Sequence, residues 1–208
     1  QSYEIQIAEN ANTSSSIGKV IANDLDVDGN VSVQYHILSG ADNKFIIDSH
    51  TGDLSVTGKL DREKKSEYIL NVTADDGVHM NHTTIIIKIL DNNDNCPEFY
   101  TNVVEYSITE NSDPNFVGNF SAFDLDDGEN GHVTVFMNDS SLNKSFRVDS
   151  DGTLRSLQKF DREEKDHYAL EIYAKDHGNP PCTNSIKVVI KIEDENDNPP
   201  VFYSEDGT

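Results

Sequence analysis

The chain has 208 residues, of which 38 are acidic and 16 are basic, so its formal net charge is −22. This length suits two domains of about 100 residues, each with a modest hydrophobic core. The excess of negative charge argues against nucleic acid or an anionic membrane as a partner, because both require a basic face. It suits a protein that collects cations.

Seven Asn-X-Ser/Thr sequons favour a secreted or cell-surface chain. We see no signal peptide and no apolar run of about 18 residues. The sequence is therefore interpreted as extracellular: part of the ectodomain of a single-pass membrane protein, with the anchor outside this chain and no direct membrane contact from the fragment. The candidate glycosylation sites are Asn12, Asn30, Asn71, Asn81, Asn119, Asn138 and Asn143.

One unit occurs twice along the chain. Ala-Asn-Asp-Leu-Asp at 22–26 returns as Ala-Phe-Asp-Leu-Asp at 122–126, and Leu-Asp-Arg-Glu at 60–63 returns as Phe-Asp-Arg-Glu at 160–163. Both offsets are 100 positions, which indicates two copies of one domain. The domain limits that we infer are 1–95 for the first, 96–198 for the second, and 199–208 for the start of a following repeat or a tail.

Within each unit, apolar and polar residues alternate over short stretches, as is typical of half-buried strands. Turn signals such as Thr51-Gly52-Asp53 separate these stretches, and no convincing helix is visible. Seven short strands per unit predict an all-β fold of two tandem seven-stranded Greek-key β-sandwiches. The predicted strands are 3–8, 17–22, 31–38, 44–47, 54–57, 68–74 and 83–90, and then 104–109, 117–122, 132–137, 145–148, 154–156, 168–174 and 185–192.

A run of oxygen-bearing side chains follows the last strand of each unit. It reads Asp-Asn-Asn-Asp-Asn at 91–95, and a near copy, Asp-Glu-Asn-Asp-Asn, stands at 194–198 before Pro199. A proline after such a run stops the preceding strand from continuing. We interpret 91–95 as a linker that becomes rigid when it binds calcium.

The alternating chain direction of a Greek key places acidic residues from distant strands at the same end of a unit. We therefore expect seven carboxylates to meet around the linker: Glu9, Asp61, Glu63, Asp94, Asp124, Asp126 and Asp176. Calcium takes six to eight hard oxygen ligands, and about three Ca²⁺ ions would nearly neutralise these charges.

The motifs come in the same order in both units: Glu-Asn, Asp-X-Asp, Asp-Arg-Glu, Ala-X-Asp and the polar linker before proline. This series resembles the extracellular cadherin repeat, twice over, along essentially the whole chain. The resemblance implies about three Ca²⁺ ions at the junction between the repeats. It adds Asn92, Asn93, Asn95 and Asn130 to the seven carboxylates as ligands.

The resemblance also implies a half site at each outer end. The C-terminal one could hold one or two ions on Glu110, Asp161, Glu163, Glu195 and Asp197. The N-terminal one would consist of Asp24, Asp26, Asn30 and Asp76.

Two cysteines are too few for a fold stapled by several disulfides. Cys96 begins unit two and Cys182 lies in the loop after its sixth predicted strand, so both fall at the same end of the sandwich. We predict a disulfide between them, with two unrelated thiols as the alternative. The histidines His36, His132 and His167 follow no metal-ligand spacing and are interpreted as surface or packing residues.

The favoured function is calcium-dependent cell–cell adhesion, in which calcium stiffens the junction and the partner is another cadherin ectodomain, homophilic or heterophilic. The alternatives are a mechanical tether, or a heterophilic receptor segment of a long cadherin without direct homophilic adhesion, and a calcium buffer with no partner. An enzyme such as a glycosidase is disfavoured, because the acidic residues recur in both units instead of pairing in one cleft. The chain has no Trp, which argues against the Trp-anchored strand exchange of classical cadherins and favours a protocadherin-like or Fat- or Dachsous-like chain.

Overall fold

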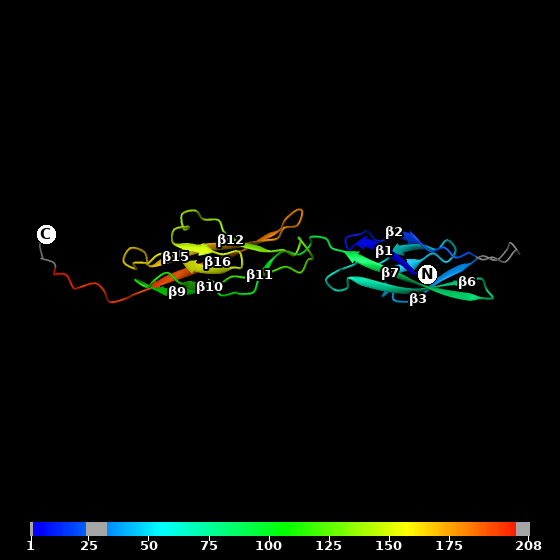
Figure 1. Ribbon diagram of the computed structural model, residues 1–208, viewed down its shortest axis with the longest axis horizontal. Helices are drawn as coiled ribbons and strands as arrows, with labels where there is room; N and C mark the ends of the chain where they lie inside the picture. Colours follow the sequence, from blue (N-terminus) through cyan, green and yellow to red (C-terminus); the bar gives the residue numbers. More distant parts are fainter. Residues whose placement is uncertain (1, 24–32, 203–208) are drawn as a thin grey trace. The chain divides into compact units, whose positions relative to one another are not determined.

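The computed structural model describes residues 2–23 and 33–202, and the chain divides into two compact units, Gln1–Asp94 and Asn95–Thr208. All the regular structure of the described residues is β-strand, as Figure 1 shows for each unit. This confirms the predicted all-β class. Among the described residues there is no helix long and apolar enough to cross a membrane.

Unit one is built of two β-sheets that enclose its core, one of four strands and one of three. The order of the larger sheet is β1-β7-β6-β3 and that of the smaller is β2-β5-β4. The strands are β1 (Ser2–Ala8), β2 (Ser16–Lys19), β3 (Gln34–Ser39), β4 (Phe45–Ile47), β5 (Asp53–Val56), β6 (Glu67–Asp75) and β7 (Met80–Leu90).

Unit two repeats this arrangement, with sheets β12-β15-β16-β9 and β10-β14-β13. It also contains a short antiparallel pair, β8 with β11, which the sequence did not predict because two-residue strands leave no alternation to detect. The strands are β8 (Glu98–Phe99), β9 (Glu105–Thr109), β10 (Phe116–Asn119), β11 (Ala122–Phe123), β12 (Thr134–Met137), β13 (Phe146–Val148), β14 (Thr153–Ser156), β15 (His167–Lys175) and β16 (Thr183–Glu193).

The first and last strands of each unit pair in parallel, and this pairing positions the acidic residues. Ala8 lies opposite Leu90, and Thr109 lies opposite Glu193. Parallel strands that are in register finish at the same edge of a sheet, so the chain leaves β1 and β7 side by side, and likewise β9 and β16. We call these edges the β7 end of unit one and the β16 end of unit two.

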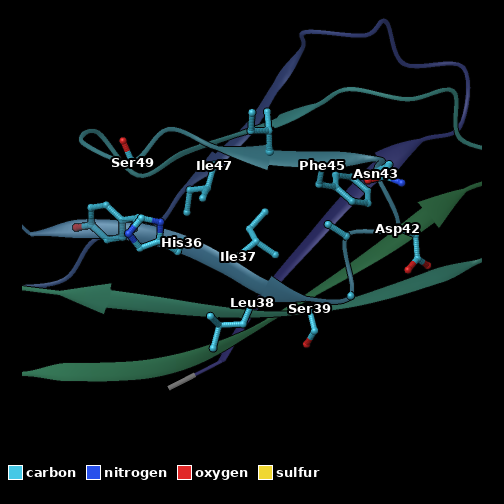
Figure 2. A pocket seen from close by; sticks show the side chains of 13 residues that line it. His36, Ile37, Leu38, Ser39, Asp42, Asn43, Phe45, Ile47 and Ser49 are labelled. Atoms are coloured by element: carbon cyan, nitrogen blue, oxygen red, sulfur yellow. The ribbon is translucent and has the colours of Figure 1, made fainter.

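The cores follow the predicted alternation. On β6, Tyr68, Leu70 and Val72 are buried, whereas Ile69 and Asn71 are exposed. The same period of two appears on β3, where Ile37 and Leu38 point to opposite faces (Figure 2). Each unit buries its own cluster of apolar side chains, which is what an independently folded sandwich requires.

Several predicted strand ends differ from the observed ones, for example those predicted at Thr83 and Ala122, where the strands begin at Met80 and end at Asn119. Two others have a clear local reason. The strand predicted at 17–22 ends at Lys19, because β2 pairs with β5 only as far as Asp53. The strand predicted from His132 begins at Thr134, because the N–H of His132 donates to the carbonyl of Glu129 in a turn.

The predicted Gly52 turn between β4 and β5 requires glycine. Its φ is +74°, and a Cβ there would lie 2.2 Å from the Val20 carbonyl oxygen.

Candidate calcium sites

The β7 end of unit one is organised around Glu9, the residue after β1. Its side chain is buried, and its two oxygens accept the backbone N–H groups of Arg62 (2.7 Å) and Asn92 (2.8 Å). One carboxylate thereby joins the end of β1, the Asp-Arg-Glu turn and the segment after β7.

Glu9, Glu63 and Asp94 form an acidic group, which we call the Glu9 cluster, in which one oxygen from each lies within 4.8 Å of the others. Burial, followed by the negative charges of Glu9 and Asp94, raises the pKa of Glu63. The ionised cluster is therefore electrostatically costly by itself, and a bound cation would relieve that cost.

Arg62 lies beside this cluster. Its guanidinium contacts Glu63 at 2.6 Å and Asp91 through Nε. Asp61 turns toward Lys64 instead, with 2.5 Å between the charged groups, and this contact lowers the pKa of Asp61. Asp61 is thus next to the cluster in sequence but is engaged by a lysine.

The β16 end of unit two repeats the arrangement. Glu110 is buried and accepts the backbone N–H groups of Arg162 (2.8 Å) and Glu195 (2.7 Å), which lower its pKa. Glu110, Asp161 and Glu163, which we call the Glu110 cluster, again bring one oxygen each within 4.8 Å of one another. The buried glutamate is therefore held in the same way in both units, whereas the third member of the cluster is Asp94 in unit one and Asp161 in unit two.

The third acidic group lies at the other end of unit two, which we call the Cys96 end. Asp124 Oδ1 accepts the N–H of Asp126 at 3.0 Å, and the Asn95 side chain donates to Asp126 Oδ1 at 2.7 Å. Burial, followed by the charges of Asp126 and Asp176, raises the pKa of Asp124. We call Asp124, Asp126 and Asp176 the Asp124 cluster.

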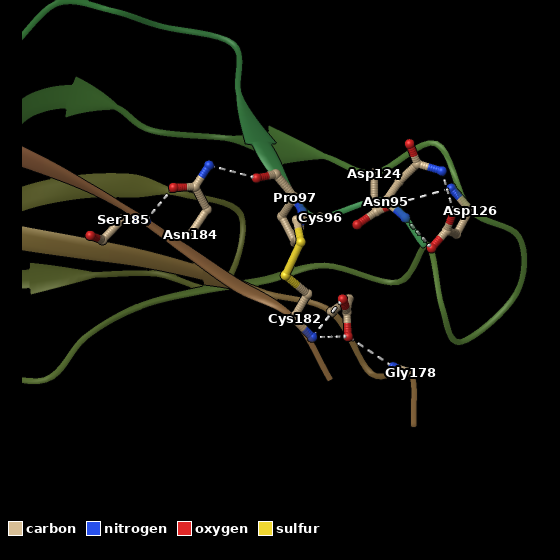
Figure 3. Close-up of a disulfide and its surroundings, with 10 residues drawn as sticks. Asn95, Cys96, Pro97, Asp124, Asp126, Gly178, Cys182, Asn184 and Ser185 are labelled. Carbon is tan, nitrogen blue, oxygen red and sulfur yellow. Dashed lines mark hydrogen bonds between the residues drawn. A yellow bond between two sulfur atoms is a disulfide. The ribbon is translucent and has the colours of Figure 1, made fainter. Parts of the chain in front are cut away.

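A disulfide fixes the two segments that carry this cluster. Cys96 and Cys182 are bonded, with their Cα atoms 5.4 Å apart, as we expected from the sequence (Figure 3). The N–H of Cys182 donates to both carboxylate oxygens of Asp176, at 3.0 and 2.9 Å, and the N–H of Gly178 donates to one of them at 3.0 Å. The disulfide thus holds the loop that orients Asp176 next to the start of unit two.

These residues fit calcium. Asp124 Oδ2 is buried and has no hydrogen-bond partner among the described residues. A buried carboxylate oxygen without a donor is costly unless a cation contacts it. Calcium prefers carboxylate and carbonyl oxygens, which are the groups gathered at these ends.

The remaining predicted ligands lie outside the three acidic clusters. Asn92 accepts a hydrogen bond from Asn10 through Oδ1 (2.7 Å), whereas in unit two Asn111, which corresponds to Asn10, donates to Asp197 (2.7 Å). The backbone N–H of Asn130 donates to the Asp127 carbonyl at 3.2 Å, and Asn93 lies in the segment after β7. Of the N-terminal half site, Asp24, Asp26 and Asn30 lie outside the described residues.

Six of the seven predicted sequons can be inspected, because Asn30 lies outside the described residues. The asparagines of all six are exposed: Asn12, Asn71, Asn81, Asn119, Asn138 and Asn143. Attachment of a glycan at each is therefore sterically feasible.

Sequence reasoning missed the arginine in the middle of the Asp-Arg-Glu motif. Arg62 and Arg162 each direct Nε at the aspartate that follows the last strand, Asp91 and Asp194 respectively. The signal was available, because the whole tripeptide recurs and not only its acidic members.

The groove between β3 and β4 of unit one does not assemble catalytic groups. His36 and Asp42, two of its titratable side chains, lie toward opposite ends of it (Figure 2). Paired acid and base groups within hydrogen-bonding reach would be needed for proton transfer.

The comparisons with known proteins agree with this architecture. The family model for the cadherin domain matches residues 3–90 and 104–193. The chain is 37% identical over 201 residues to human Protocadherin Fat 4, which covers 96% of this chain and 4% of that protein. Similar solved structures include mouse Cadherin-23 EC22-24, with a TM-score of 0.84 and 30% identity, which covers 93% of this chain and 63% of that one. They also include protocadherin gammaB7 EC3-6, with a TM-score of 0.81 and 28% identity, which covers 95% of this chain and 47% of that one.

The chain belongs to the cadherin family and consists of two tandem cadherin repeats. Its relatives are protocadherins and Fat cadherins, so the non-classical assignment is confirmed. This is a family of calcium-binding adhesion proteins and not of enzymes. The chain spans 4% to 19% of the length of Protocadherin Fat 4 and Protocadherin-7.

Proposed function

We propose that this chain is an extracellular segment of a cell-surface cadherin, and that calcium makes the junction between its two repeats rigid so that an adhesive surface is presented in a defined orientation. The observation that carries the proposal is the Asp124 cluster, in which a buried carboxylate oxygen has no protein donor among the described residues. The Glu9 cluster in the preceding repeat supplies a second group of oxygens.

The linker supports sharing of ions between the two repeats. Asp94 belongs to the Glu9 cluster and the next residue, Asn95, donates to Asp126 of the Asp124 cluster. One peptide bond therefore joins residues of the two ligand groups. The proposed ligands of about three ions are Glu9, Asp61, Glu63, Asn92, Asn93, Asp94, Asn95, Asp124, Asp126, Asn130 and Asp176.

Calcium would act as a structural ion. Its charge would offset the burial and the repulsion that raise the pKa values of Glu63 and Asp124. It would also make bending of the linker costly, because bending would separate ligands from the ion. The carboxylate of Asp61 would release Lys64 and bind calcium instead.

The Glu110 cluster, with Glu195 and Asp197, is proposed as a further site for one or two ions. The repeats are proposed to end at residues 95 and 198.

The proposed partner is another cadherin ectodomain. The solved repeats of protocadherin gammaB7 form a cis-dimer, which supports this class of partner. A tether without homophilic adhesion is the second candidate, favoured by the small share of Protocadherin Fat 4 that the chain spans. Analytical ultracentrifugation in calcium separates the two, because homophilic adhesion predicts a concentration-dependent dimer and the tether predicts a monomer.

Isothermal titration with Ca²⁺ tests the sites. We expect Asp94→Asn and Asp124→Asn each to weaken calcium binding, because each removes a ligand charge. Asp113→Asn is the matched control, because Asp113 is exposed and forms an ion pair with Lys159 at 3.1 Å. Calcium binding that is equal in all three variants and the wild type would refute the assignment.

A further inference from the structure

A different group of metal-ligating side chains lies at the Cys96 end of unit two. Glu129, His132 and His177 each place one potential ligand atom within 4.8 Å of the other two. The two imidazole rings are stacked, with centroids 4.4 Å apart and an interplanar angle of 15°. We call these three residues the His132–His177 site.

The backbone holds the two histidines together although they are far apart in sequence. The carbonyl oxygen of Glu129 accepts the N–H of His132 at 3.3 Å and the N–H of His177 at 3.2 Å. One carbonyl group therefore fastens the loop before β12 to the loop after β15. The proximity of the rings follows from this backbone arrangement and not only from the rotamers of two exposed side chains.

A hydrogen bond to a neighbouring hydroxyl group also orients the imidazole ring of His177. His177 Nε2 lies 2.7 Å from Thr134 Oγ1 on β12. If Nε2 donates to the hydroxyl, Nδ1 keeps its lone pair for a metal. Metal-binding histidines usually have such a partner on the second ring nitrogen.

The sequence of the other repeat has different residues at these positions. At the positions 100 residues earlier, unit one has Gly29, Ser32 and Gly77 in its sequence. Glu129, His132 and His177 are therefore particular to unit two, whereas the acidic motifs occur in both.

The ligand set differs in kind from that of the acidic clusters. Two imidazoles and one carboxylate suit a borderline divalent ion such as Zn²⁺, whereas calcium prefers oxygen alone. Ligand atoms around tetrahedral zinc are about 3.3 Å apart, given bond lengths of about 2.0–2.1 Å. The side chains of His132 and Glu129 are 62% and 79% exposed, so small rotations can close the remaining distance.

We propose that Glu129, His132 and His177 form a binding site for a divalent transition-metal ion, separate from the calcium ligands and present in the second repeat only. Such an ion would link the loop before β12 to the loop after β15.

The test is a titration of the full chain with Zn²⁺ in excess Ca²⁺, which keeps the acidic clusters filled. The wild type should bind one zinc ion saturably, and His132→Ser and His177→Gly should each weaken binding by at least about tenfold. The imidazole NMR signals of His132 and His177 should shift together. His167→Ser is the matched control, because His167 is an exposed histidine that contacts a carboxylate, Asp166, at 2.6 Å.

Calcium binding, measured on the same variants, should be unchanged, so that failure of the zinc site and failure of the calcium sites are distinguishable. The proposal is overturned if zinc does not bind saturably, or if both variants bind it as the wild type does, which would assign zinc to the carboxylates as an adventitious ion. A parallel loss of calcium binding in the variants would assign the effect to loop folding and would also overturn it.

Discussion

The buried carboxylate of Glu9 offers the sharpest test of how the ends of the repeats are built. Glu9→Ala would leave two backbone N–H groups, those of Arg62 and Asn92, without their acceptor. Both hydrogen bonds are only partly buried, and removing Glu9 also relieves repulsion with Glu63, so the free energy of unfolding of unit one should fall by about 1–3 kcal/mol in EDTA. Glu9 is therefore expected to be a structural group besides its proposed role as a calcium ligand.

Glu63→Ala is the matched comparison, because Glu63 belongs to the same cluster but its pKa is raised by burial and by neighbouring carboxylates. In EDTA its removal relieves repulsion, and the loss of stability should be much smaller than for Glu9→Ala. Hydrogen exchange of peptides from β6 and β7, followed by mass spectrometry, isolates the stability of unit one. Equal losses for the two variants in EDTA would refute the structural role of Glu9.

Three further predictions concern single features. Burial and neighbouring charges raise the pKa of Asp124, so Asp124→Asn should maintain or raise the stability of unit two in EDTA and lower the stability that unit two gains from calcium. Thermal unfolding measures both effects, and a clear loss of stability in EDTA would contradict this prediction. Replacing both Cys96 and Cys182 by Ser opens a link with a sequence separation of 86 and should destabilise unit two by at most about 4–5 kcal/mol in denaturant unfolding, whereas no change would show that the link is dispensable. The backbone N–H groups of the β4–β5 turn lower the pKa of Asp48, so the contribution of its carboxylate to stability is present above the ordinary value of 3.8 and is lost as the pH falls through the lowered pKa. In acid unfolding, the stability difference between wild type and Asp48→Asn should therefore become smaller as the pH falls below 3.8. A difference that does not depend on pH would contradict this stabilising role of Asp48.

The repeat architecture was predictable because two independent patterns agree, the period of two within strands and the recurrence of motifs after 100 residues. Strand ends were less predictable, since local hydrogen bonds determine them; the turn that begins β12 at Thr134 is an example. The two-residue strands β8 and β11 carry no periodic signal at all.

The candidate sites, too, could be predicted from the sequence only in part. The acidic positions could be identified because each motif recurs, but the contact of Asp61 with Lys64 could not, since sequence does not fix the direction of an exposed side chain. The pairing of His132 with His177 was missed for another reason. The two residues are distant in sequence, and they meet because the antiparallel register of β12 and β15 pairs Thr134 with Lys175 and because the Glu129 carbonyl accepts both histidine N–H groups.

The central claim is that calcium joins the two repeats into one rigid body. Backbone ¹⁵N relaxation of the full chain, measured in calcium and in EDTA, tests it directly, because it reports the tumbling of each unit separately. A junction made rigid by calcium predicts one common diffusion tensor for both units in calcium, and separate, faster tumbling in EDTA. Tumbling of the two units that is the same in both conditions would contradict it.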